Sequence, residues 1–376
     1  MSSLIDIVII NYRSAEDTLA AIAGVTPWPH GGIWLVDNSE DGAQAAKLAS
    51  AVAGNPAVQL LVPDRNLGFG GGCNLAFAQS SAEYLLLLNP DARIDGRNIE
   101  VLVDAMRRHP DFGAVSPKTF WDPERRFLLP SAFPPTPPVM LAMTLALHAP
   151  SLTKYAAGRY LRRMRISMAA AEPFATRFLV GAVMLLRRSA VLAAGGLFDP
   201  GYFMFYEDSD LSLRLRRTGH RLGIVPAAEA VHEYRHKPFK AEMMAESAQT
   251  YFAKNFPWFY RWTEQLSRLD HWGRPASWDE WGEVLPHPVG KPEELHAQLG
   301  GAAILALSPS AMMMPALFRP LDAAPVALST QDWARLEPGR YMLACSGGES
   351  GSTVRWVGFE RAESGDNRAE TRQVLR

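Results

Sequence analysis

Hydrophobic and polar positions alternate in blocks along the first part of the chain. Continuous apolar runs, rich in β-branched residues, are typical of strands buried on both faces, and they lie at residues 5–10, 33–36, 58–62 and 84–88. Amphipathic segments between and after these runs predict helices at 16–25, at 44–53, from Asn74 onward and at 99–109. This order predicts βαβ units, and therefore an α/β fold with a mostly parallel sheet flanked by helices.

Polar clusters directly follow the predicted strands. Asn11 and Arg13 follow the first, Asp37 follows the second, and Asn89 and Asp91 follow the fourth. Because ligands of such sheets bind beyond the carboxyl ends of the strands, we expect these side chains near one another. A carboxylate such as that of Asp91 can hold a divalent cation against a diphosphate, although Asn-Pro-Asp taken alone is more often ordinary turn chemistry.

A glycine-rich segment, RNLGFGGGCN, follows the third predicted strand at residues 65–74. We interpret it as a loop, containing Asn66 and Gly68, that leads into the helix from Asn74. Glycines permit close backbone approach, and a helix start offers free N–H groups to an anion. A packing role explains the glycines equally well, and the segment lacks the Gly-Lys-Ser/Thr sequence of a Walker loop.

Three acids and a histidine are the remaining candidates for catalysis or metal binding. Glu207, Asp208 and Asp210 lie between an aromatic, glycine-rich loop and a predicted helix. They can complement the helix dipole, or one of them can act as a general base. Since residues two apart do not share a helix face, we assign Asp210 to a structural ion pair with Arg214. His232 can be structural or can complete a metal site.

The second half of the chain changes character several times. Residues 130–150 are proline-rich, and irregular, extended structure is expected there. The basic stretch 151–170 contains no acid and predicts either a solvated helix or one that lies on an anionic membrane surface. A helix is expected at 243–259. Apolar runs at 303–307, 326–329, 341–345 and 353–359 predict a small β-rich unit with a frayed tail from Ala362.

Composition narrows the class of protein. Of 376 residues, 48% are hydrophobic and 20% charged, which is typical of a globular protein. Lys and Arg number 38 against 39 Asp and Glu, which argues against a nucleic-acid binder. Two cysteines exclude a disulfide scaffold and suit a reducing compartment. No signal peptide is predicted, because Asp6 interrupts the first apolar run.

Five segments occur in a specific order and spacing over some 230 residues. They are IDIVIINYRS, WLVDNSEDG, RNLGFGGGCN, YLLLLNPDARI and FLVGAVMLLRRSAVLAAGGLFDPGYFMFYEDSDLSLRLRRTGHRLGIVPAAEAVHE. Together they resemble the inverting family 2 glycosyltransferases of the GT-A fold, closest to bacterial rhamnosyltransferase-like members. The resemblance implies a glycosyltransferase domain at 1–270, with a donor half at 1–120 and an acceptor half at 121–270. The β-rich accessory domain at 280–376 lies outside it.

The resemblance also implies a role for each candidate residue. The nucleotide sugar would be bound by Asn11, Arg13, Asp37, Asn66, Gly68 and Asn89. Mg²⁺ or Mn²⁺ would be held by Asp91 and His232, and the asparagine at position 89 weakens this cation site relative to a motif with two aspartates. Asp208 would be the general base, and Glu207 would help to position the acceptor.

We therefore expect an inverting enzyme that transfers a sugar from a nucleoside-diphosphate donor to a hydroxyl of a glycan or lipid-linked acceptor in surface polysaccharide synthesis. The favoured donor is dTDP-rhamnose, and a UDP-sugar is next. The alternative is a non-catalytic relative that binds nucleotide or glycan. The expected location is cytoplasmic, or peripheral at the inner face of the membrane through residues 151–170. Assembly as a homo-oligomer and the role of the C-terminal unit are left open.

Overall fold

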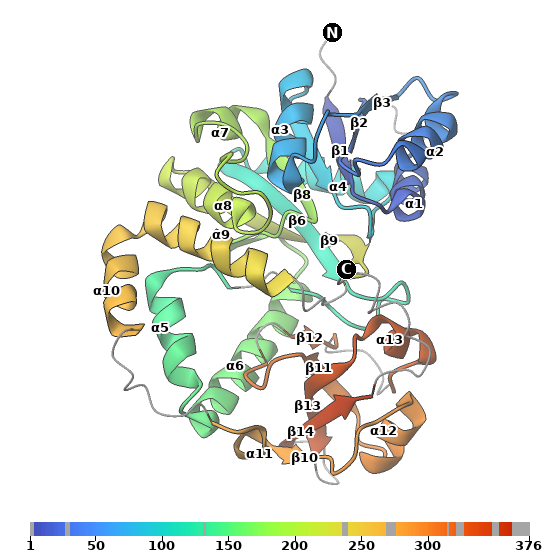
Figure 1. Ribbon diagram of the computed structural model, residues 1–376. Coiled ribbons are helices and arrows are strands. Elements are labelled where there is room, and N and C mark those ends of the chain that lie inside the picture. The colour runs from blue at the N-terminus through green and yellow to red at the C-terminus, as the bar shows by residue number, and fades with distance from the viewer. Residues whose placement is uncertain are drawn as a thin grey trace.

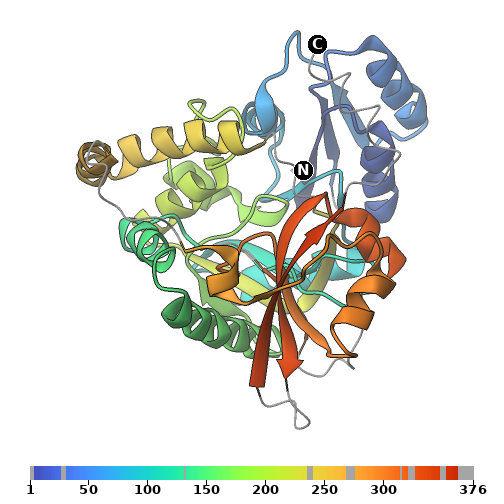
Figure 2. The same ribbon diagram turned by 60° about the horizontal axis from the view of Figure 1, so that its bottom comes forward.

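Two β-sheets of different size organise the chain (Figure 1). The computed structural model describes residues 4–26, 31–130, 133–234, 240–267, 276–313, 316–320, 327–347 and 353–362. In Figure 1 the dark-blue N-terminal strands and helices lie at the top of the molecule and the red C-terminal segment lies at the bottom, and Figure 2 shows the same arrangement with the bottom turned forward.

The larger sheet is a nine-stranded α/β sheet. Its strands are β1 (Ile5–Asn11), β2 (Ile33–Asp37), β3 (Val58–Leu61), β4 (Tyr84–Leu88), β5 (Ala92–Arg93), β6 (Phe112–Phe120), β7 (Phe174–Thr176), β8 (Val183–Arg187) and β9 (Arg221–His232). Their order is β3-β2-β1-β4-β8-β6-β9-β5, with β7 also paired to β9. Strands β3, β2, β1, β4, β6 and β9 run one way, and β8, β5 and β7 run the other. The predicted mostly parallel sheet is confirmed.

Helices cover both faces of this sheet, and further helices, such as α5 on α6 and α10 on α9, pack on those. The helices of this part of the chain are α1 (Ala15–Val25), α2 (Gly42–Val52), α3 (Gly68–Gln79), α4 (Gly96–Arg108), α5 (Pro137–Ala146), α6 (Pro150–Met168), α7 (Arg188–Ala193), α8 (Glu207–Arg217), α9 (Lys240–Asn255) and α10 (Pro257–Ser267). Alternate residues of β1 point to opposite faces, as strand geometry requires. Ile7 and Ile9 share a core with α1, α2 and α4, whereas Val8 and Ile10 share one with α3, α6 and α8.

The C-terminal unit is a separate five-stranded sheet, which confirms the predicted β-rich unit. Its strands are β10 (Glu283–Val284), β11 (Ile304–Ser308), β12 (Leu317–Phe318), β13 (Gly339–Gly347) and β14 (Thr353–Arg361), and its helices are α11 (Trp278–Trp281), α12 (Pro292–Gln298) and α13 (Thr330–Arg335). Their order is β10-β14-β13-β11-β12. Leu128 and Phe318 exchange both backbone hydrogen bonds, so the second unit is joined directly to the first.

The glycine-rich segment was wrongly predicted as a loop, because most of it is helix. Helix α3 begins at Gly68, six residues before the predicted start at Asn74. Gly68 has a φ of +71°, and a Cβ there would lie 2.1 Å from the carbonyl oxygen of Phe203. Further along, a Cβ at Gly72 would lie 3.1 Å from the side chain of Asn38. The glycines therefore allow close packing around the start of a helix whose intrinsic propensity is low.

The proline-rich stretch was also wrongly predicted, because it contains helix α5. Pro137 and Pro138 occupy its first turn, where a missing N–H costs nothing, and the following VMLAMTLA is helix-forming. The helix predicted at 243–259 is divided into α9 and α10 at Pro257, which occupies the first position of α10. The strand expected from 178 begins only at Val183. Residues 327–329 form no strand, and residues 363–376 lie outside the described part.

Candidate active site

Asn11, at the end of β1, lies inside a buried hydrogen-bond network. Its side-chain amide donates to Asp37 Oδ1 at 2.8 Å and to Ser39 Oγ at 2.9 Å, and its oxygen accepts from Thr18 Oγ1 at 2.7 Å. Asn11 is fully buried and Asp37 nearly so. The structure thus brings the ends of β1 and β2 together, and Asn11 contributes by fixing the Asp37 carboxylate. Arg13 is exposed beside them, and its backbone N–H donates to Ser39 Oγ at 2.8 Å.

The start of α3 closes against this network and against the loop before α8. Asn38 Nδ2 donates to the carbonyl oxygen of Gly68 at 2.8 Å. Asn66 Oδ1 accepts from the Gly68 N–H at 2.9 Å, and Phe69 N–H donates to the carbonyl oxygen of Phe203 at 3.0 Å. Asn66 and Gly68 therefore lie between the ends of the first strands and the acidic start of α8.

Asp91 and His232, 141 positions apart in the sequence, meet at one edge of the sheet. Strand β5 pairs antiparallel with the end of β9, so Ala92 is opposite His232. His232 Nε2 lies 3.3 Å from Asp91 Oδ1, and the backbone N–H of Glu233 donates to the Asp91 carbonyl at 3.0 Å. The His232 side chain is buried, whereas that of Asp91 is 41% exposed, so this pair has one side open to a ligand.

Gly181 and Ala182 connect the Asn-Pro-Asp turn with the acidic start of α8. The Ala182 carbonyl accepts from the Asn89 N–H at 2.8 Å. The neighbouring Gly181 N–H donates to Asp208 Oδ2 at 3.2 Å. Gly181, which holds the carboxylate of Asp208, is thus the chain neighbour of Ala182, which binds the turn that carries Asp91. Analysis of the sequence missed this role of Gly181, because residues 178–186 read as an uninterrupted strand.

Glu207 and Asp208 occupy different environments on the first turn of α8. Glu207 is buried, and its Oε2 has no hydrogen-bond partner. Burial, with the neighbouring Asp208 charge, raises the pKa of Glu207 to about 8. Asp208 is only partly buried, and loss of solvent raises its pKa to about 6. At neutral pH this arrangement supplies a protonated carboxyl beside a carboxylate that is more basic than an ordinary aspartate.

Asp210 has the structural role predicted from its spacing to Arg214. Its fully buried carboxylate accepts from Arg214 Nε at 2.7 Å, from Lys254 Nζ at 2.9 Å and from Asn255 Nδ2 at 3.0 Å. These partners lower the pKa of Asp210 against the effect of burial. The ion pair fixes α8 to α9 and leaves Glu207 and Asp208 as the acids near the strand ends.

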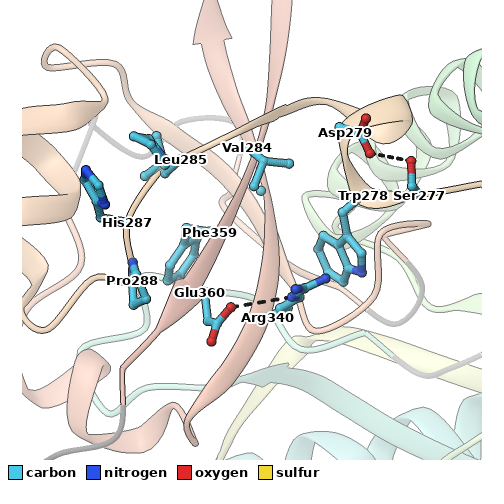
Figure 3. A pocket seen from close by; sticks show the side chains of 12 residues that line it. Ser277, Trp278, Asp279, Val284, Leu285, His287, Pro288, Arg340, Phe359 and Glu360 are labelled. Carbon is cyan, nitrogen blue, oxygen red and sulfur yellow. Dashed lines mark hydrogen bonds and ion pairs between the residues drawn. The ribbon is translucent and has the colours of Figure 1, made fainter.

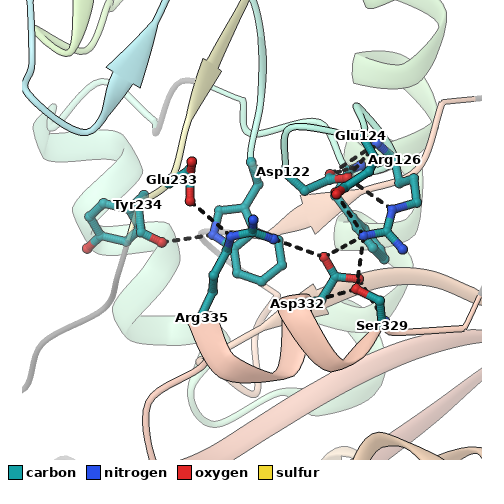
Figure 4. A network of polar contacts seen from close by, with 10 residues as sticks. Asp122, Glu124, Arg126, Glu233, Tyr234, Ser329, Asp332 and Arg335 are labelled. Atoms are coloured by element: carbon teal, nitrogen blue, oxygen red, sulfur yellow. Dashed lines mark hydrogen bonds and ion pairs between the residues drawn. The ribbon is translucent and has the colours of Figure 1, made fainter. Parts of the chain in front are cut away.

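A second acidic cluster lies at the junction of the two units (Figure 4). Oxygens of Asp122, Glu124 and Asp332 lie within 4.8 Å of one another, close enough to hold a metal ion. Arg126 already pairs with all three, at 3.1 Å from Asp122, 3.1 Å from Glu124 and 2.9 Å from Asp332. The guanidinium supplies the positive charge that these acids need, so we interpret the cluster as an ion-pair network.

Arg335 extends this network toward the Asp91–His232 pair. It lies on α13 between Asp332 and Glu233, and its Nε pairs with the Glu233 carboxylate at 3.1 Å (Figure 4). Glu233 follows His232 directly in the chain. The C-terminal unit is thus in direct contact with the segment that carries the candidate metal ligand, a link that nothing in the sequence pattern indicated.

A cavity of about 360 Å³ lies within the C-terminal unit (Figure 3). Trp278 and Arg340 line one side of it, and His287 and Pro288 line the other. None of its lining residues is one of the candidate residues at the strand ends or at the start of α8, so this cavity is separate from the candidate active site.

Residues 5–259 match the model of a family described as glycosyltransferase like family 2. The chain belongs to this glycosyltransferase family. It is 30% identical over 251 residues to an N-acetylglucosaminyl-diphospho-decaprenol L-rhamnosyltransferase of Mycobacterium tuberculosis, a match that covers 63% of this chain and 78% of the relative. It is also 40% identical over 83 residues, 22% of this chain and 27% of the relative, to the rhamnosyltransferase WbbL of Escherichia coli.

The solved structure of GalNAc-T7 with UDP, GalNAc and Mn²⁺ is similar to this glycosyltransferase with a TM-score of 0.49 and 14% identity. That match covers 73% of this chain and 52% of the other. The match of residues 5–259 to the family model confirms the resemblance to family 2 glycosyltransferases of the GT-A fold that the motifs indicate. The protein is a nucleotide-sugar-dependent glycosyltransferase with rhamnosyltransferase relatives. Among the residues that the structure describes, no helix is long and apolar enough to cross a bilayer.

Proposed function

We propose that this glycosyltransferase transfers a sugar, with inversion, from dTDP-rhamnose to a hydroxyl of a lipid-linked glycan, and that a UDP-sugar is the next candidate donor. The observation that carries the proposal is the position of Asp208. Its carboxylate is held by the Gly181 N–H, next to the turn of Asn89 and Asp91. The choice of donor and acceptor rests on the name of the mycobacterial relative, an L-rhamnosyltransferase of a decaprenol-linked N-acetylglucosamine.

Asp208 is the proposed general base. A base works best when its pKa lies near the operating pH, and partial burial moves that of Asp208 to about 6. Its carboxylate would accept the proton of the acceptor hydroxyl as that oxygen attacks the anomeric carbon. A single displacement inverts the anomeric configuration, so one base suffices. Glu207, protonated at neutral pH, would donate a hydrogen bond that positions the acceptor.

Asp91 and His232 are the proposed ligands of Mg²⁺ or Mn²⁺. A carboxylate and an imidazole 3.3 Å apart, with the carboxylate open on one side, suit such an ion. The buried Oδ1 of Asn89 has no hydrogen-bond partner and offers a further oxygen on the same turn. The bound cation would neutralise charge on the leaving diphosphate. Asn11 and Asp37, with Arg13, Asn66 and Gly68, would form the nucleotide side of the site.

A transfer assay tests the proposal. Purified protein is given an acceptor of polyprenyl-diphosphate-linked N-acetylglucosamine and, in parallel, dTDP-rhamnose, UDP-glucose, UDP-N-acetylglucosamine or GDP-mannose. We expect a glycolipid product with dTDP-rhamnose that requires Mg²⁺ or Mn²⁺. Transfer from a UDP-sugar alone would correct the donor. Nucleotide binding without product from any donor would support the non-catalytic alternative.

A further inference from the structure

Helices α5, α6 and α10 form one side of the molecule, opposite the strands β1–β3 (Figures 1 and 2). Helix α5 contains no charged residue, yet Leu141 and Leu145 are exposed, Leu145 to 51%. At the start of α6, Leu152 is 69% exposed and Tyr155 is also exposed. Large apolar side chains that gather in solvent usually mark an interaction surface.

The outer face of α6 combines these apolar residues with cations. The inner stripe of the helix buries Ala157 and Leu161. The arginines at 159, 162 and 163 all lie exposed on the outer face. No aspartate or glutamate occurs between residues 125 and 171. A solvated surface helix normally mixes both signs of charge, so this distribution selects an anionic partner.

Helix α10 adds two tryptophans next to α5. Trp258 and Trp262, one turn apart, are exposed, Trp258 to 66%. Between them Phe259 points inward, into a cluster that Met140 of α5 also contacts. The exposed tryptophans are therefore held on a rigid helix beside the apolar face of α5. Tryptophan is the side chain most typical of the membrane–water interface.

We propose that the α5–α6–α10 face, comprising the exposed residues of these three helices, docks on the surface of an anionic lipid bilayer. The leucines and tryptophans would enter the interface, and the arginines of α6 would pair with lipid phosphates. This inference rests on the proposed function in one respect: a lipid-linked acceptor gives the enzyme a reason to approach the bilayer.

A second copy of the chain is a less suitable partner for this face than an anionic bilayer. A twofold interface pairs a surface with itself, which would bring the arginines of α6 from two copies together, and neither α5 nor α6 contains an acid to offset them. A bilayer that contains phosphatidylglycerol supplies both the apolar interior and the negative charge.

Flotation with lipid vesicles tests the proposal without any sugar nucleotide, so its result is independent of the proposed function. The probes are vesicles of phosphatidylcholine alone and of phosphatidylcholine with phosphatidylglycerol. The variants are Arg159→Glu/Arg162→Glu/Arg163→Glu and Trp258→Ser/Trp262→Ser. Matched controls are Arg107→Glu/Arg108→Glu on the exposed end of α4, and Leu192→Ser on α7, where the leucine is 56% exposed.

We expect the wild type to bind the anionic vesicles selectively and to be released by salt. The arginine variant should bind about a hundredfold more weakly, the tryptophan variant about tenfold or more, and the controls as the wild type does. Circular dichroism of each variant verifies its fold. Equal binding by the arginine variant and the wild type would overturn the proposal. A wild type that binds no anionic vesicles would also overturn it. If the arginine variant then loses a dimer that the wild type forms, as measured by sedimentation velocity, the face is a contact between two copies of the chain.

Discussion

Glu207→Gln should change how the stability of the protein depends on pH. In the folded chain burial raises the pKa of the Glu207 carboxyl from 4.5 to about 8. The folded state therefore holds a proton that the unfolded state releases above about pH 4.5. The contribution of this group to stability is complete below about pH 4.5 and is lost as the pH rises to about 8.

The size of this effect follows from the difference in pKa. Each unit corresponds to about 1.4 kcal/mol, so the loss reaches at most about 5 kcal/mol at about pH 8 and amounts to about 3 kcal/mol at about pH 7. Glutamine keeps the shape of the side chain and does not titrate. The variant should therefore equal the wild type near pH 5 within about 1 kcal/mol and exceed it by about 4 kcal/mol near pH 8.

Urea unfolding at these two pH values, without nucleotide or metal, measures the difference. Asp104→Asn on the exposed surface of α4 is the matched control and should leave the pH dependence unchanged. Parallel stability curves for the wild type and Glu207→Gln would refute the reasoning, because they would mean that Glu207 ionises in the folded state as it does in water.

Three further predictions concern the network, the metal site and the base. Arg126→Met should lower the free energy of unfolding by about 3–5 kcal/mol, because it removes a positive charge that pairs with the fully buried carboxylates of Asp122 and Asp332. Urea unfolding measures this free energy, and a loss below about 1 kcal/mol would contradict the prediction. Asp91→Asn should weaken calorimetric binding of dTDP with Mn²⁺ about tenfold or more and leave binding in EDTA unchanged; equal losses in both would contradict its role as a metal ligand. The kcat/KM of transfer should rise as the pH passes through about 6, where Asp208 loses its proton, and a flat profile from about pH 5 to about pH 8 would contradict that assignment.

The parts of this fold that follow from local patterns could be predicted from the sequence. Buried strands such as β1 and β4 are continuous apolar runs, and parallel strands place their polar ends at one edge of the sheet. For this reason Asn11 and Asp37 could be expected to meet, and they do. The contact between Asp91 and His232 required the family resemblance in addition, because β5 has only two residues and no periodicity reveals its pairing with β9.

Other features depend on tertiary contacts that no local pattern encodes. The glycines of α3 read as a loop because their helix propensity is poor, and only packing against Phe203 and Asn38 explains them. Gly181 contributes a backbone N–H, which is the same in every residue type except proline. The Arg335–Glu233 pair spans 102 positions between the two units, and each residue reads as an ordinary surface charge in the sequence.

The most direct test of the central claim is the transfer rate of Asp208→Asn, measured beside the affinity of the same variant for the donor nucleotide. The amide is isosteric and cannot take the proton of the acceptor hydroxyl. We predict a loss of about 10²- to 10⁴-fold in kcat with nucleotide affinity within about threefold of the wild type. A variant that keeps its kcat while the wild type transfers sugar would contradict the assignment of Asp208 as the base.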